Sequence, residues 1–174
     1  MKARALRSIL PVLAAYAVVL GAGVLWARAE PKQRLCPGVG SLVVVDTATR
    51  VLCLCRDGQE AGRFRVALGR GRLEKRLELD GKTPLGRYSL SAAIPSSRFH
   101  LFLPVGYPTP EQRARGYSGS AIGVHGPHVA FAWLGHWTTW PDWTQGCIAV
   151  GTHGEIEEIS RWVATSGGVE IVLL

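Results

Sequence analysis

Short apolar runs closed by turns constrain the fold of this 174-residue chain more than any other feature. Residues 42–46 and 51–55 are two such runs, and the short segment between them is typical of a hairpin turn. Further strands are expected at residues 62–68, 87–93 and 169–174. After a capping-box pattern at Thr152 and Glu155, apolar residues recur at helical spacing instead. The chain is therefore predicted to be mainly β, a sandwich or flattened barrel with one C-terminal amphipathic helix.

Residues 1–29 differ from the rest of the chain and are typical of a targeting segment. Basic residues precede an almost wholly apolar run over residues 9–27, whose end resembles a signal cleavage site. This run is also close to the membrane-spanning length of about 20 residues, so a cleaved signal peptide and a retained inner-membrane anchor both remain open. Either way we expect export to the periplasm or cell envelope, with membrane contact only through residues 9–27. Residues 30–40 then form a linker, and residues 41–174 form one domain.

The formal charge of +7 comes largely from the targeting segment, whose four basic residues leave +3 for the rest of the chain. Nucleic-acid-binding domains usually concentrate basic residues on one face, so this balance argues against a nucleic-acid partner. A basic cluster does occur over residues 63–76. We interpret it as a solvated strand-and-loop face, and the alternative is attraction to an anionic envelope polymer or lipid surface.

The four cysteines of an exported domain would meet an oxidising compartment, where structural thiols tend to pair. Cys53 and Cys55 are neighbours on one strand face and are awkwardly placed to bond to each other. A bridge from Cys36 to either of them is more plausible and leaves one thiol over. The alternative is that Cys53 and Cys55 are simply small apolar strand residues.

A histidine and a cysteine, His125 and Cys147, stand close in sequence among small residues. A thiol acyl-transfer enzyme needs this pair, because a thiolate attacks the carbonyl while an imidazole keeps it ionised and moves the protons. The neighbouring glycines let backbone N–H groups approach the oxyanion of the tetrahedral intermediate.

These residues resemble the L,D-transpeptidase catalytic-domain family, whose hallmark is apolar-His-Gly, a variable insert, and then Ser/Thr-x-Gly-Cys. Val124-His125-Gly126 and Thr144-Gln145-Gly146-Cys147 match it. Upstream, residues 81–88 are similar to the family's Thr-Pro-x-Gly-x-aromatic segment, and residues 99–101 and 107–108 to the strand and turn before the histidine. The resemblance spans roughly residues 41–174.

Residues 142–149, Asp-Trp-Thr-Gln-Gly-Cys-Ile-Ala, are similar to one subset of that family. Two positions depart from many members: Gln145 replaces a histidine, and Ala149 replaces an arginine. The missing arginine affects the expected contact to the substrate carboxylate and leaves the thiol chemistry intact.

The resemblance implies a β-rich sandwich and an exported cysteine acyltransferase that acts on peptidoglycan. Cys147 would attack the L-centre carbonyl of a tetrapeptide stem, expel the terminal D-residue and pass the acyl group to a second amine. Water or a lipoprotein lysine could replace that amine as the acceptor. The resemblance also implies inhibition by carbapenem-type β-lactams, a role in cell-wall organisation and cell shape, and no metal or organic cofactor.

The family orients its histidine with a backbone carbonyl, which here would belong to Gly126. The backbone N–H groups of Gly146 and Cys147, with Tyr107 across the cleft, are our candidates for the oxyanion hole. Asp142 is an alternative group to orient His125, although we expect it to cap a turn.

Thr144 would hold the cysteine loop or touch substrate, and Trp143 would pack in the core or form a shelf for substrate. Residues 127–143 contain four tryptophans, which argues against disorder, and we predict that this insert is a lid over the acyl donor.

Two non-enzymatic interpretations remain as alternatives. One is an envelope-polymer binder that uses the tryptophans and the basic cluster. The other is a zinc-binding module, for which the irregularly spaced candidate ligands are His125, His128, His136, Cys147 and His153.

Overall fold

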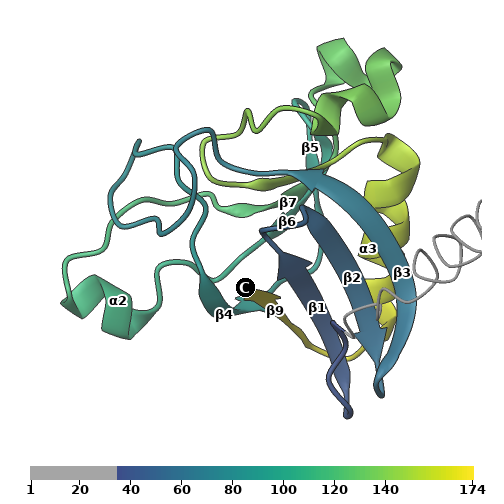
Figure 1. Cartoon of the computed structure of the whole chain (residues 1–174), viewed down its shortest axis with the longest axis horizontal. Helices are drawn as coiled ribbons and strands as arrows, with labels where there is room; N and C mark the ends of the chain where they lie inside the picture. The colour runs from purple at the N-terminus through teal and green to yellow at the C-terminus, as the bar shows by residue number, and fades with distance from the viewer. Residues whose placement is uncertain (1–34) are drawn as a thin grey trace, which may run out of the picture. The chain divides into compact units, whose positions relative to one another are not determined.

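The computed structural model describes residues 35–174, so the predicted targeting segment and residues 30–34 of the predicted linker lie outside the described residues. Nine strands in the described part form one curled, half-barrel sheet, in the order β4-β9-β1-β2-β3-β8-β7-β6-β5 (Figure 1). They are β1 (Ser41–Asp46), β2 (Val51–Arg56), β3 (Gln59–Ala67), β4 (Gly86–Leu90), β5 (Ile94–Ser96), β6 (His100–Pro104), β7 (Gly123–His125), β8 (Ile148–Val150) and β9 (Val169–Leu173). The prediction of a mainly β fold is confirmed.

β1 and β2 form the hairpin expected from the sequence and pair antiparallel from Ser41–Arg56 to Asp46–Val51. The central four residues of each strand are buried. Successive strand residues point to opposite faces, so burial on both faces explains why these runs are continuously apolar. One face joins the main core through Val43, Val45, Leu52 and Leu54, and the other forms a smaller cluster of Leu42, Val44, Cys53 and Cys55.

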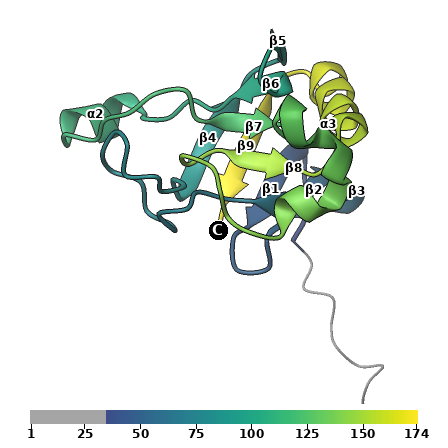
Figure 2. The same cartoon turned by 90° about the horizontal axis from the view of Figure 1, so that it is seen from above.

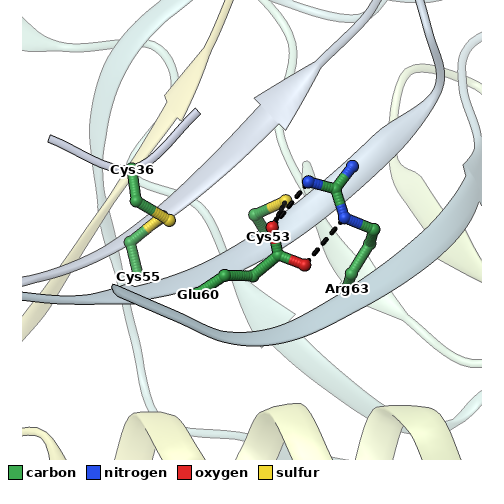
Figure 3. Close-up of a disulfide and its surroundings, with 5 residues drawn as sticks. All are labelled: Cys36, Cys53, Cys55, Glu60 and Arg63. Atoms are coloured by element: carbon green, nitrogen blue, oxygen red, sulfur yellow. Dashed lines mark hydrogen bonds and ion pairs between the residues drawn. A yellow bond between two sulfur atoms is a disulfide. The ribbon is translucent and has the colours of Figure 1, made fainter. Parts of the chain in front are cut away.

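A disulfide between Cys36 and Cys55 closes the smaller cluster (Figure 3). It is one of the two bridges that the sequence left open, and it ties the segment before β1 to β2. Cys53 remains a buried free thiol whose Sγ lies 3.8 Å from a carboxylate oxygen of Glu60. Burial raises the pKa of Cys53 to about 11, which makes this thiol a poor nucleophile.

Helix α3 (His153–Thr165) is the amphipathic helix predicted from the sequence. It begins at the expected capping box, in which Thr152 and Glu155 bond to each other's backbone N–H groups. Its buried residues Ile156, Ile159 and Val163 pack into the main core. The short helix α2 (Pro110–Ala114) lies on the opposite side of the sheet from α3 in both views (Figures 1 and 2). Within residues 35–174, no helix is both long enough and apolar enough to cross a bilayer.

Candidate active site

Two neighbouring parallel strands, β7 and β8, carry the predicted histidine and cysteine. Val124 lies opposite Ile148, and His125 lies opposite Ala149. Val124 and Ile148 are fully buried in the main core, so the alternation of side chains sends His125 and Cys147 to the other face of the sheet. The structure thus places the two residues that the sequence singled out on adjacent strands, with Cys147 directly before β8.

His125 is enclosed by aromatic rings and is only 1% exposed. Phe99 stacks on it with the ring centroids 4.0 Å apart, and Trp143 meets it edge-on at 5.8 Å. Its Nδ1 lies 2.7 Å from the carbonyl oxygen of Gly126. A carbonyl only accepts, so Nδ1 carries the hydrogen and Nε2 is left as the proton acceptor. Burial lowers the pKa of His125 to about 4, so the ring is neutral at neutral pH.

Cys147 is partly buried, and its thiol donates to the carbonyl oxygen of Ala121 at 3.3 Å. Burial raises the pKa of Cys147, while the Gly123 N–H and the positive charge of Lys75 act in the opposite direction. The thiol is therefore protonated at neutral pH. The expectation that an imidazole keeps a thiolate ionised is not supported, because burial favours the neutral form of both groups. A neutral pair instead calls for proton transfer to His125 as the sulfur attacks.

The loop before Cys147 depends on Gly146 and Thr144. Gly146 has a φ of +122°, and a side chain there would collide with the carbonyl oxygen of Lys82, so the position requires glycine. The Thr144 hydroxyl donates to the Cys147 carbonyl at 2.7 Å and accepts from the Gly146 N–H at 3.1 Å. Thr144 is buried and both of these bonds lie within the loop. Of its two expected roles, the structure therefore supports holding the loop.

Two of the predicted oxyanion donors have other partners. The Gly146 N–H donates to Thr144, and the buried Tyr107 hydroxyl donates to the Lys75 carbonyl at 3.0 Å. Burial also raises the pKa of Tyr107 to about 12, so this hydroxyl stays protonated and keeps its hydrogen bond to the Lys75 carbonyl. Of the predicted set, the backbone N–H of Cys147 is the donor that remains.

The sequence over residues 40–171 matches the L,D-transpeptidase catalytic domain, YkuD. The chain belongs to this family. A comparison with curated proteins found no match.

Solved structures show the same fold. Pgp2 of Campylobacter jejuni, a helical cell shape determining protein, is 20% identical with a TM-score of 0.66, over 77% of this chain and 47% of that one. Bd1075 of Bdellovibrio bacteriovorus is 19% identical with a TM-score of 0.57, over 78% and 47%. An L,D-transpeptidase of Xylanimonas cellulosilytica is 18% identical with a TM-score of 0.51, over 88% and 68%. This L,D-transpeptidase domain thus spans about half the length of Pgp2 and Bd1075.

Asp142, weighed as an alternative partner for His125, has a different role in this L,D-transpeptidase domain. It forms an ion pair with Arg50 at 2.8 Å and accepts the Leu68 N–H at 3.0 Å. These contacts hold the end of the tryptophan-containing insert to the residue before β2 and the residue after β3, and His125 bonds instead to the Gly126 carbonyl.

The insert at residues 127–143 folds largely into the 3₁₀ segment η1 (Val129–Thr139), drawn in green at one end of the sheet in Figure 2. Trp143 packs beside His125, and its indole N–H donates to the Thr138 carbonyl at 2.9 Å. The other three indoles are exposed: Trp133 at 80%, and Trp137 and Trp140 at 69% each. These three tryptophans are therefore not core residues. An apolar cavity of about 430 Å³ lies within the insert, lined by His128, Phe131, Leu134, Trp137, Thr138, Pro141 and Trp143.

The zinc-site alternative gains no support from the geometry. Among residues 35–174, no three His, Cys, Asp or Glu side chains gather closely enough to bind a metal ion. His153 stacks on His100 at 4.6 Å, and His128 accepts the N–H of Ala130 in the first turn of η1.

Sequence reasoning missed two residues near the candidate histidine and cysteine. Phe99 was placed in the strand before the histidine, but its stacking on His125 depends on the fold. Lys75 was grouped with the solvated basic cluster, yet only 4% of it is exposed. An available signal was Asp80, five residues later and directly before the Gly-Lys-Thr-Pro segment, because a buried lysine needs an acidic partner.

Proposed function

We propose that this chain is an exported cysteine acyltransferase that performs L,D-transpeptidation on peptidoglycan stem peptides. One observation carries the proposal. β7 and β8 are adjacent strands: β7 carries a neutral imidazole whose Nδ1–H is held by the Gly126 carbonyl, which leaves Nε2 as a base, and the thiol of Cys147 directly precedes β8. The family match supplies the substrate class.

In the acylation step, Nε2 of His125 accepts the thiol proton while Sγ of Cys147 attacks the carbonyl carbon of the L-residue. The negative charge develops on the former carbonyl oxygen, within reach of backbone donors such as the Cys147 N–H. His125 then returns the proton to the amide nitrogen. The C–N bond breaks, the terminal D-residue leaves, and a thioester remains on Cys147.

In the second step, an amine of a neighbouring stem peptide attacks the thioester and gives a proton to His125. The new amide bond forms, and the sulfur leaves and regains its proton. Attack by water would release a tripeptide, and attack by a protein lysine would attach the stem to a lipoprotein. We favour the peptide amine because the family acts as transpeptidases, and we place the reaction in the periplasm or cell envelope. By its likeness to Pgp2, cell shape is the process that we expect it to serve.

The test is incubation of the purified full-length chain with disaccharide tetrapeptide, with and without a second stem peptide, followed by mass spectrometry. Loss of the terminal D-residue together with a cross-linked dimer is the expected result. Loss of that residue without dimer would replace the transferase with a hydrolase, and intact substrate would refute acyl transfer.

Cys147→Ser tests the nucleophile, because a hydroxyl is far harder to ionise than a thiol. We expect no product and an intact fold. The matched control is Cys53→Ser, which removes the other free thiol and should leave turnover unchanged. A carbapenem should add its mass to the wild-type chain and to Cys53→Ser, but not to Cys147→Ser.

A further inference from the structure

Lys75 is a buried cation at the end of a loop that supports the cysteine. Its side chain is 3% exposed, and its ammonium lies 2.8 Å from a carboxylate oxygen of Asp80 and 3.0 Å from the carbonyl of Leu77. Asp80 also accepts the backbone N–H groups of Arg76, Leu77 and Lys82. These bonds fix the position of the charge and offset the desolvation cost of a buried cation, which is high unless the cation is paired and hydrogen-bonded.

Two contacts connect this loop with the segment that holds Cys147. A Cβ at Gly119 would lie 3.0 Å from Cε of Lys75 and 3.6 Å from its Nζ, so the ammonium packs directly against Gly119. Two residues later, the Ala121 carbonyl accepts the hydrogen bond from the Cys147 thiol. On the other side of the cysteine loop, the Lys82 carbonyl lies against Gly146. The Lys75 loop therefore packs close to the cysteine from both sides.

We propose that Lys75 is a positioning residue that places a fixed positive charge near Cys147 and so stabilises the anionic sulfur as its proton leaves. This inference rests on the proposed function, in which Cys147 is the nucleophile. In this proposal the two residues have separate roles. His125 accepts the thiol proton, and its burial keeps the ring neutral before the reaction. Lys75 provides the positive charge and does not contact the substrate.

The described segments around Cys147, outside the Lys75 loop, do not carry a positive charge that could stabilise the anionic sulfur. From β7 the titratable neighbour is His125, which is neutral, and residues 118–121 and 143–146 contain no charged side chain. The supporting loop contributes Lys75, its partner Asp80 and Lys82. Within the described residues, Lys75 is the charged side chain whose field lowers the pKa of Cys147.

The experiment is the pH dependence of iodoacetamide labelling at Cys147, followed by mass spectrometry of the Cys147 peptide in the full-length chain. This readout needs no substrate, so it is separate from the turnover that tests the proposed function. Lys75→Met should raise the apparent pKa of labelling by about one unit, which makes labelling about tenfold slower at neutral pH. Lys75→Arg should restore most of the wild-type profile.

Asp80→Asn is the decisive matched variant. It removes the negative partner and leaves the ammonium, so it should lower the apparent labelling pKa, opposite to Lys75→Met. A purely structural role for the ion pair would shift both variants in the same direction, and that result would overturn the proposal. An unchanged pKa in folded Lys75→Met would do so as well. If circular dichroism shows that Lys75→Met is unfolded, the sign of the Asp80→Asn shift decides.

Discussion

The strand pair β7–β8 and the insert between these strands are adjacent in the sequence, but side chains are buried and bonded on the strand pair and largely exposed on the insert. On the strand pair, His125 is buried and bonded to the backbone, and the loop of Cys147 is fixed by Thr144. On the insert, three large indoles face outward although burial would favour them. The strand pair has the rigidity that proton transfer needs, whereas the insert offers an apolar face that the fold itself does not use.

The insert is nevertheless joined to the rest of the fold at several points. Asp142 is tied to Arg50 and Leu68, and Trp143 packs on His125. Earlier residues of the insert are held as well: Thr139 is fully buried, and the Val129 N–H donates to the Arg98 carbonyl at 2.9 Å. The comparison teaches that the insert is anchored to the fold at several residues and still leaves the indoles of Trp133, Trp137 and Trp140 facing outward.

The largest expected effect comes from removing the base. His125→Gln should reduce turnover about 10²–10⁴-fold, the range typical of losing a general base, because His125 is the group proposed to accept the thiol proton. Steady-state rates with disaccharide tetrapeptide measure it.

His128→Gln is the matched control on the insert side, and we expect its rate to stay within a few-fold of wild type. Equal losses in the two variants would mean that rigidity and chemistry are not confined to the strand pair.

The next effect is a pH dependence of stability from the same side chain. Burial lowers the pKa of His125 to about 4, from the reference value of 6.5 expected in the unfolded chain. Between these values the unfolded chain binds a proton that the folded chain does not, so the free energy of unfolding falls as the pH is lowered from 6.5 to 4. A shift of this size corresponds to about 3 kcal/mol. Denaturant unfolding at several pH values in this window measures it.

His125→Gln should flatten that dependence, because glutamine does not titrate. The depressed pKa of Asp80 adds its own loss only below the ordinary carboxyl value of 3.8, outside the window. A slope unchanged in His125→Gln would contradict the buried, neutral histidine.

Sequence patterns predicted the features that depend on near neighbours. The hairpin of β1 and β2 and the capping box of α3 each follow from residues a few positions apart. The protonation states were missed because they depend on rings from distant segments, such as Phe99 over His125. The sequence predicted more oxyanion donors than the structure leaves available, because the Gly146 N–H donates its hydrogen bond to the Thr144 hydroxyl. Lys75 was assigned to the solvated face because the sequence shows a basic cluster but does not show which of its side chains is buried.

Two tryptophans of the insert should differ in their contribution to stability. Trp143→Ala removes the edge contact with His125 and a hydrogen bond to Thr138, and should cost about 2–3 kcal/mol of unfolding free energy. Trp133→Ala removes an indole that is 80% exposed and should change stability by no more than about 0.5 kcal/mol. Chemical denaturation of both variants measures the difference. Similar costs would mean that the whole insert is packed as part of the core.

The smallest expected effect concerns what the exposed indoles do. If the insert is a lid over the acyl donor, its indoles exclude water from the thioester, because apolar rings over a reacting group remove the solvent that would hydrolyse it. Replacing Trp133, Trp137 and Trp140 together by alanine should leave the fold and the acylation of Cys147 intact while raising the ratio of hydrolysis to cross-linking a few-fold. The matched control is Val39→Ala, which removes an equally exposed apolar side chain before β1. Mass spectrometry of tripeptide and dimer gives the ratio. An unchanged ratio in the folded triple variant would reject the lid and leave the outward indoles to another partner.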